Sequence, residues 1–268
     1  MCIAAASETS TPKTWLSGAA ARRVNCNPLA LNAIARMPNG GRYEASTAAL
    51  VNLGKAVACD GHRLTIDPRA ASPNFCSGGT YLVFLSVIER LHREGRIILT
   101  TETARALIVH GQQDGEDVWG RWNANGPGTA RLFFELGLGR NFTDFKRARP
   151  GDFMKIWWNH EIGSKERGHS VVFLGGAVDK DGTRTVSFWS SNTPDGFGKL
   201  TIPRHKVRRA VFSRLERPGR IAAAARLPFM DEYLADMLRR PGSEEEMFAM
   251  TGIKSPPQTP RIAAPHQK

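Results

Sequence analysis

The 268-residue sequence has no apolar run of the length that spans a bilayer, about 18 residues or more. Its start also lacks the basic segment followed by an apolar stretch that marks a secretion signal. No glycine-rich loop is followed by lysine and a hydroxyl residue, and no histidine has metal-ligand spacing with a cysteine pair. We therefore expect no transmembrane segment, no metal and no cofactor.

Cysteine is scarce, with only four residues in the chain, which excludes a fold held together mainly by disulfides. The sequence leaves open whether Cys26 and Cys59 form a disulfide in an oxidising compartment. The other two cysteines are Cys2 and Cys76.

Negative charge is also in short supply, since 37 Lys and Arg face 25 Asp and Glu, a formal net charge of +12. A hydrophobic fraction of 41% excludes an intrinsically disordered chain. The positive balance fits a solvated surface, or it favours an anionic partner such as a polymer or a membrane surface. No recognised nucleic-acid motif accompanies the charge, so we do not expect nucleic acid binding. The sequence does not indicate an oligomeric state.

The order of the predicted elements favours an α+β fold, with helices first and an antiparallel sheet after them. We expect a partly ordered N-terminal arm over 1–45 with one short helix near 28–36, a domain over 46–252, and a flexible proline-rich tail over 253–268. The periodicity predicts helices over 47–57, 76–94, 101–110, 128–137, 227–240 and 243–250. Strands are predicted over 153–158, 169–174, 185–190, 199–203 and 207–213.

Cys76 is the leading candidate for a nucleophile, because it lies in the first turn of the most apolar predicted helix. Unpaired N–H groups at that end carry partial positive charge, which favours the thiolate and stabilises an oxyanion. Small residues follow it, and we expect Ser77 to leave the sulfur accessible to substrate. Asn74 is a candidate second donor to the oxyanion.

His169 is the best candidate base, because it opens a strong strand directly after Gly168. A third residue must orient the imidazole through its other ring nitrogen. Alternation along the following strand puts Ser190 and Asn192 on one face. Asn192 is the preferred third residue and Ser190 the alternative. Trp158 is a candidate to line the substrate cleft.

Three blocks, in this order, resemble the NlpC-type cell-wall cysteine peptidases. FCSGGTYLVF at 75–84 is similar to the family's nucleophile helix, and RPGDF at 149–153 to the start of its first sheet strand. GHSVVFLG at 168–175 is similar to its catalytic-histidine strand. Phe75 departs from the pattern, because the family usually has Asp before the nucleophile. The stretch from Cys76 to His169 is also longer than usual and is filled by the segment 119–145, and the spacing from His169 to Asn192 exceeds the usual one.

The resemblance implies a papain-like fold over about 74–192, with the nucleophile helix packed on an antiparallel sheet. It also implies that Cys76, His169 and Asn192 hydrolyse amide bonds of peptidoglycan stem peptides through an acyl-enzyme, without a cofactor. The partner would then be peptidoglycan or another anionic wall polymer, and a periplasmic or secreted location would follow from that function. Two alternatives stay open: a lipid-ester hydrolase or acyltransferase on the same fold, and a non-catalytic protein that binds the cell wall.

Overall fold

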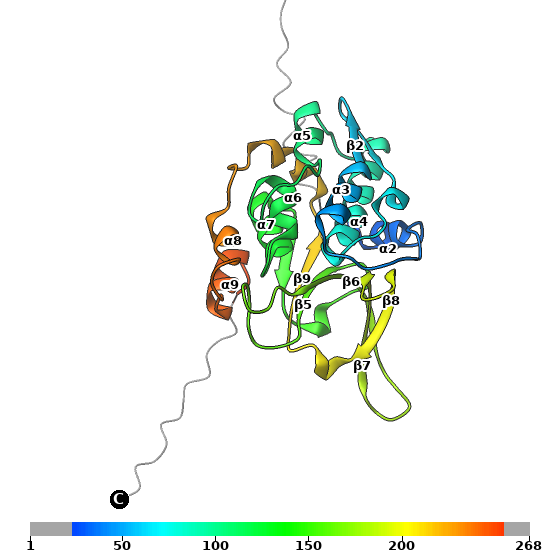
Figure 1. Cartoon of the computed structure of the whole chain (residues 1–268), viewed down its shortest axis with the longest axis vertical. Coiled ribbons are helices and arrows are strands. Elements are labelled where there is room, and N and C mark those ends of the chain that lie inside the picture. The colour runs from blue at the N-terminus through cyan, green and yellow to red at the C-terminus, as the bar shows by residue number, and fades with distance from the viewer. Residues whose placement is uncertain (1–22, 255–268) are drawn as a thin grey trace, which may run out of the picture.

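The computed structural model describes residues 23–254, and within them the chain forms an α+β structure around a seven-stranded antiparallel sheet (Figure 1). The strand order is β1-β8-β7-β6-β5-β9-β4. A separate hairpin is made by β2 and β3. The sheet strands are β1 (Gly40–Gly41), β4 (Gly139–Phe142), β5 (Phe153–Trp157), β6 (His169–Val178), β7 (Arg184–Asn192), β8 (Gly196–Pro203) and β9 (Arg209–Leu215), and the hairpin strands are β2 (Val57–Asp60) and β3 (Arg63–Ile66).

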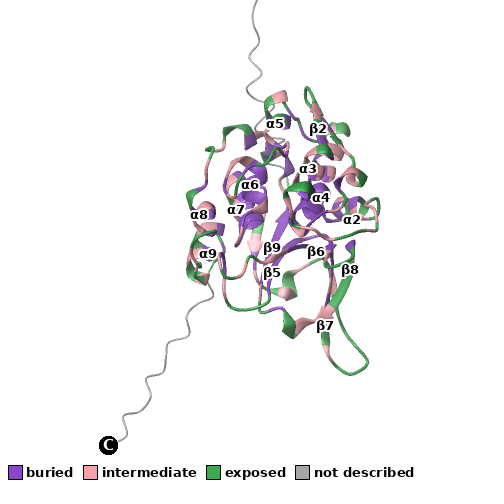
Figure 2. Ribbon diagram, viewed as in Figure 1, coloured by how far each residue is buried: buried purple, intermediate pink, exposed green. Residues whose placement is uncertain are grey.

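Helices cover one face of this sheet, and the central one is α4, which contacts β6 and β7 (Figure 1). Nearly every residue in the middle of α4 is buried, as its all-round apolar sequence predicts (Figure 2). The helices are α2 (Asn27–Ile34), α3 (Thr47–Lys55), α4 (Cys76–Arg93), α5 (Thr101–Ala106), α6 (Asp117–Asn123), α7 (Gly128–Leu136), α8 (Glu232–Asp236) and α9 (Glu244–Thr251).

The two faces of the sheet bury different apolar clusters. Phe153, Val172 and Trp189 point into the large core beneath α4. The opposite face has its own core, which includes Val171 and Phe212 and is closed by short 3-10 turns and loops. Successive side chains along a strand therefore point alternately into one core and into the other.

The predicted antiparallel meander and the helix after residue 76 are confirmed, but several elements differ. The hairpin of β2 and β3, helix α6 and strand β4 were not predicted, because each is at most seven residues long and carries little periodicity. The single helix expected over 227–240 is wrong: a 3-10 turn ends at Arg226 and α8 is only five residues long.

The short helix expected near 28–36 is confirmed as α2, but the second half of the arm expected over 1–45 belongs to the domain. Residues 24–45 pack on the domain, because Ala30 and Cys26 are buried in the main core. Strand β1 pairs with β8, and the Val24 N–H donates to the Glu216 carbonyl at 2.7 Å. Residues 1–22 and 255–268, which include most of the expected tail, lie outside the described residues.

Candidate active site

Cys76 is the first residue of α4, where the backbone leaves donors free. The N-cap residue Phe75 supplies no side-chain hydrogen bond, and the first intrahelical bond runs from the Gly79 N–H to the Phe75 carbonyl. The N–H groups before it in the helix therefore have no intrahelical acceptor and carry the positive end of the helix dipole. This end of α4 is suited to hold a thiolate or an oxyanion.

Gly78 and Gly79, which follow Cys76 in α4, allow the helix to pack closely against its neighbours. A Cβ at Gly78 would lie 2.2 Å from Asn74 Oδ1, and a Cβ at Gly79 would lie 3.1 Å from Phe197. The glycines thus let the first turn of α4 approach the loop before it and the sheet below it. Accessibility of the sulfur, which we expected these residues to provide, comes instead from the cavity in front of Cys76.

His169 and Asn192 meet at the edge where β6 begins and β7 ends. The His169 Nε2 lies 3.2 Å from Asn192 Oδ1. The Asn192 amide donates to the Gly198 carbonyl at 2.9 Å, which directs its oxygen toward the imidazole. Because that oxygen only accepts, Nε2 carries the hydrogen, and Nδ1 is the nitrogen left for Cys76.

Two aromatic rings hold the imidazole in place. Trp158 stacks on His169 with a centroid distance of 6.1 Å, and Phe188 meets it edge-on at 5.9 Å. Trp158 is 42% exposed, so it covers the histidine from the solvent side. These contacts and the Asn192 hydrogen bond restrict the orientation of the ring.

The thiol of Cys76 is acidic because charges and donors converge on it. Burial alone would raise its pKa, but the charge of His169 and a hydrogen bond to that ring lower it more. The charge of Lys155 and the backbone N–H of Ser170 act in the same direction. The resulting pKa of Cys76 is lowered from 9.0 to about 6.

Two residues at this site were not predicted from the sequence, Tyr43 and Lys155. The Tyr43 side chain hydrogen-bonds to Cys76, and burial, followed by the charge of Cys76, raises the pKa of Tyr43 to about 12. Tyr43 is therefore a neutral donor toward a thiolate. Lys155 lies on β5 and is 5% exposed. Lys155 could have been found from the sequence, because a lysine in the middle of the apolar strand FMKIW is unusual and indicates a special role.

A cavity of about 650 Å³ opens in front of Cys76. Its lining is largely polar, and the segment that is longer than in the NlpC-type pattern contributes Asn123 and Asn125 to it. The Ser77 hydroxyl donates to Asn123 Oδ1 at 2.6 Å, so Ser77 lies in the wall. The other lining residues include Tyr43, Ser46, Thr47, Asp114, Lys155, Arg167 and Gly168.

Three predicted residues have other placements. Asn74 is 1% exposed and does not line the cavity, because its Oδ1 accepts from the Phe75 N–H beneath the helix start. Ser190 is fully buried and donates to the Ser170 carbonyl at 2.7 Å, so Asn192 and not Ser190 reaches the imidazole. Trp158 covers His169 and is not among the residues that line the cavity.

Cys26, Cys59 and Cys76 are free thiols in the part of the chain that the structure describes, so Cys26 and Cys59 are not paired there. Cys26 is buried in the core, and burial raises its pKa to about 12, which makes it unreactive. Cys2 lies outside the described residues.

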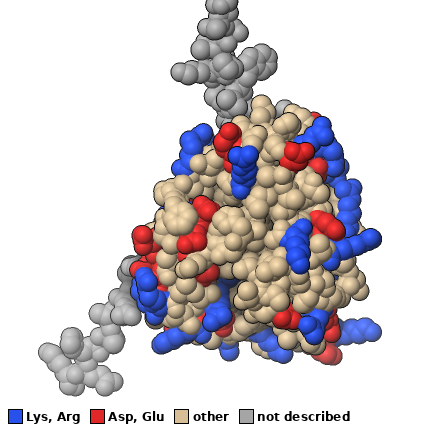
Figure 3. Space-filling view, turned by 45° about the horizontal axis from the view of Figure 1, so that its top comes forward, with Lys and Arg blue, Asp and Glu red and all other residues tan. Residues whose placement is uncertain are grey.

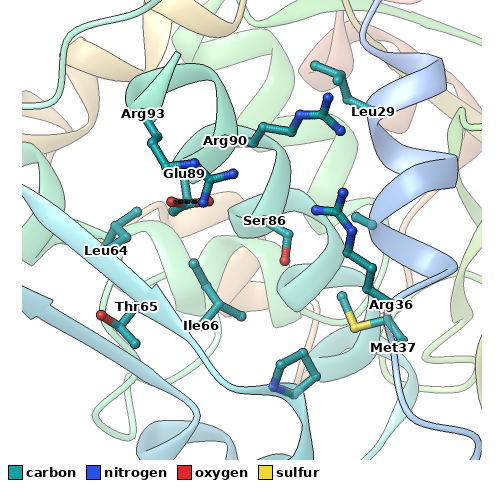
Figure 4. Close-up of a pocket in the computed structure, with 12 residues that line it drawn as sticks. Leu29, Arg36, Met37, Leu64, Thr65, Ile66, Ser86, Glu89, Arg90 and Arg93 are labelled. Atoms are coloured by element: carbon teal, nitrogen blue, oxygen red, sulfur yellow. Dashed lines mark hydrogen bonds and ion pairs between the residues drawn. The ribbon is translucent and has the colours of Figure 1, made fainter. Parts of the chain in front are cut away.

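Other hollows lack the chemistry found around Cys76. A cavity of about 390 Å³ beside the C-terminal half of α4 has arginines over an apolar floor (Figure 4). Arg90 is paired with Glu94 and Arg93 with Glu89, and the lining contains none of the predicted catalytic residues.

Within residues 23–254 no group of three or more His, Cys, Asp or Glu is arranged to hold a metal ion. The same residues contain no helix with the length and apolar character that a membrane span requires. On the face drawn in Figure 3, Lys and Arg side chains are interspersed with Asp and Glu, and no single basic patch dominates that face.

Comparisons with protein-family models, with curated proteins and with solved structures found no match.

Alkylation of Cys76 by iodoacetamide should be half-maximal near pH 6 and should increase with pH, because the thiolate is the reactive form and its pKa is about 6. The variant His169→Ala should move the midpoint to higher pH, since it removes a charge and a hydrogen bond. Peptide mapping by mass spectrometry separates Cys76 from the other thiols. The exposed His205 offers a matched control, and His205→Ala should leave the midpoint unchanged. A midpoint near the free-thiol value of about 8.5 in the unaltered protein would contradict the described electrostatics.

Proposed function

We propose that the protein is a cysteine hydrolase of papain-like fold that cleaves amide bonds in peptidoglycan stem peptides. The observation that carries the proposal is the meeting of Cys76, His169 and Asn192, which come from three separate elements. Of the three, Cys76 lines the polar cavity. The three sequence blocks similar to the NlpC-type peptidases contribute two of these residues. The free N–H groups at the start of α4 supply the oxyanion site.

In the proposed reaction the Cys76 thiolate attacks the carbonyl carbon of the scissile amide. The Cys76 N–H and the helix dipole stabilise the negative oxygen of the tetrahedral intermediate. His169 gives the proton on Nδ1 to the leaving nitrogen, which departs as an amine and leaves a thioester on Cys76. His169 then takes a proton from water, the hydroxide attacks the thioester, and the acid product leaves as the thiolate reforms.

Asn192 acts as the positioning residue of this reaction. Its oxygen fixes the imidazole with Nε2–H outward and stabilises the imidazolium that pairs with the thiolate. Trp158 shields that hydrogen bond from water by stacking on the ring.

The lining of the cavity favours a peptide over a lipid ester. An apolar tunnel over the sulfur would favour an acyl chain, but the walls carry Ser46, Asn123 and Lys155. A non-catalytic wall-binding protein would not need an acidic thiol beside an oriented imidazole. Both alternatives therefore have less support than amide hydrolysis.

The test is digestion of purified peptidoglycan, with separate measurement of new amino groups and new reducing sugar ends. A parallel incubation with phospholipid vesicles measures released fatty acid. Amide hydrolysis predicts new amino groups and an equal amount of new carboxyl groups, without new reducing sugar ends or fatty acid. Release of fatty acid without amino groups would support the lipid-ester alternative, and no product from either material would contradict the proposal.

A further inference from the structure

Lys155 is a buried cation with few protein partners. It is 5% exposed and lines the cavity in front of Cys76. Its ammonium has three donors, but its one hydrogen bond among the described residues is a long one, 3.4 Å to the Ala124 carbonyl. Within those residues no carboxylate lies within 4.0 Å of it. A buried ammonium with unused donors is costly unless an anion faces it.

The fold holds Lys155 in this position. It pairs with Ser170 in the register between β5 and β6, next to His169. A Cβ on Gly168 would lie 2.7 Å from the Lys155 Cε and 3.0 Å from Trp157 Nε1. Gly168, with φ of +76°, therefore makes room for the lysine stem below the mouth of the cavity.

The charges around the cavity leave a place for an anion. The carboxylate in the lining is Asp114, which accepts from the Asn125 N–H at 2.7 Å and whose pKa is raised by burial. Glu166 accepts from the Gly168 N–H and is not part of the lining. Arg167 adds an exposed second cation to the cavity wall.

Burial lowers the pKa of Lys155, and the charges of Cys76, Asp114 and Glu166 oppose that shift. The strongest of these anions in the resting site is the Cys76 thiolate. That charge disappears when the sulfur becomes a thioester, while the lysine stays buried. A substrate that brings its own carboxylate would restore the balance at that step.

Resting on the proposed function, we infer that this cavity selects peptides that carry a free carboxylate close to the scissile amide, with Lys155 as the residue that binds it. A carboxylate offers a charge and acceptors to an ammonium whose donors are otherwise unused. A peptide with a carboxamide instead of this carboxylate has no charge at that position, and its N–H donors would face the ammonium of Lys155.

The experiment uses two synthetic stem peptides that differ only in a carboxylate or a carboxamide next to the scissile amide. We expect kcat/KM to be about 10- to 100-fold higher for the carboxylate peptide, because hydrogen bonds to charged groups discriminate by this amount. Lys155→Met should reduce the ratio to near one. The matched control Lys165→Gln changes an exposed lysine away from the cavity and should keep the ratio.

Because Lys155→Met also weakens the thiolate, binding is measured separately in the Cys76→Ala background. The measurement is made at pH 6, because burial lowers the pKa of Lys155 and a lower pH favours its charged form. The carboxylate peptide should bind about tenfold or more tightly than the carboxamide, and adding Lys155→Met should abolish the difference. Equal hydrolysis and equal binding of the two peptides would overturn the inference and leave the proposed function standing. Selective binding of the carboxylate peptide, with no hydrolysis of either peptide, would support the inference and contradict the proposed function.

Discussion

Replacing Cys76 with alanine should reduce the release of amino groups from peptidoglycan by about 10⁴-fold or more, to the level of the blank. The reason is that the sulfur forms the covalent bond to the acyl group, so no other group at the site can take over the step. His169 and the oxyanion donors stay in place, and substrate binding should survive. The loss should therefore appear in kcat, measured by amine release over time.

A second free thiol provides the matched control for this change. Cys59 lies on β2, away from the lining of the cavity, and is half-buried. Cys59→Ala should digest peptidoglycan at the rate of the unaltered protein. Equal product release by Cys76→Ala and Cys59→Ala would remove Cys76 from the reaction.

Replacing Arg214 with methionine should lower the free energy of unfolding by about 3–5 kcal/mol, because it leaves a buried carboxylate unpaired. Asp152 is fully buried, and Arg214 binds it with two hydrogen bonds of 2.8 and 2.7 Å. The same carboxylate accepts from Asn27 Nδ2 at 2.9 Å and from the Arg149 N–H at 2.8 Å. Urea denaturation followed by tryptophan fluorescence measures the change.

An exposed ion pair shows how much of this effect comes from burial. Arg239 pairs with Asp236 with most of its side chain exposed, 74%. Arg239→Met should change the free energy of unfolding by less than about 1 kcal/mol, as is usual for surface pairs. A comparable loss in both variants would mean that the burial of Asp152 does not decide the cost.

The sequence predicts which residues meet at the site better than it predicts their surroundings. Cys76 follows from a cysteine at the start of an apolar helix, and Asn192 follows from strand alternation after His169. The contact between Asn192 and His169 could be predicted, because it depends on side-chain alternation along one strand. Tyr43 was missed because its place depends on long-range backbone contacts: its N–H donates to the Pro194 carbonyl, and it forms an isolated bridge with Asn74. No local pattern encodes such a contact.

The same distinction explains the errors in the fold. The long strands and α4 repeat their apolar pattern over enough residues to specify their type. Elements such as β4 and α6 are short, and tertiary packing decides their conformation. The sequence predicts Asn74 as a second donor to the oxyanion, but in the structure its Oδ1 accepts from the Phe75 N–H. Its side chain lies beneath the helix, and only the direction of the loop backbone determines that.

The segment before α3 has a practical consequence for anyone who shortens the chain for crystallisation. A version that starts at residue 46 would lose a strand of the sheet and expose the Phe197 side of β8. It would also lose the Tyr43 donor to Cys76, so the surviving thiol would differ in acidity from that of the intact protein. A shortened version should therefore keep Val24, whose N–H donates to the Glu216 carbonyl.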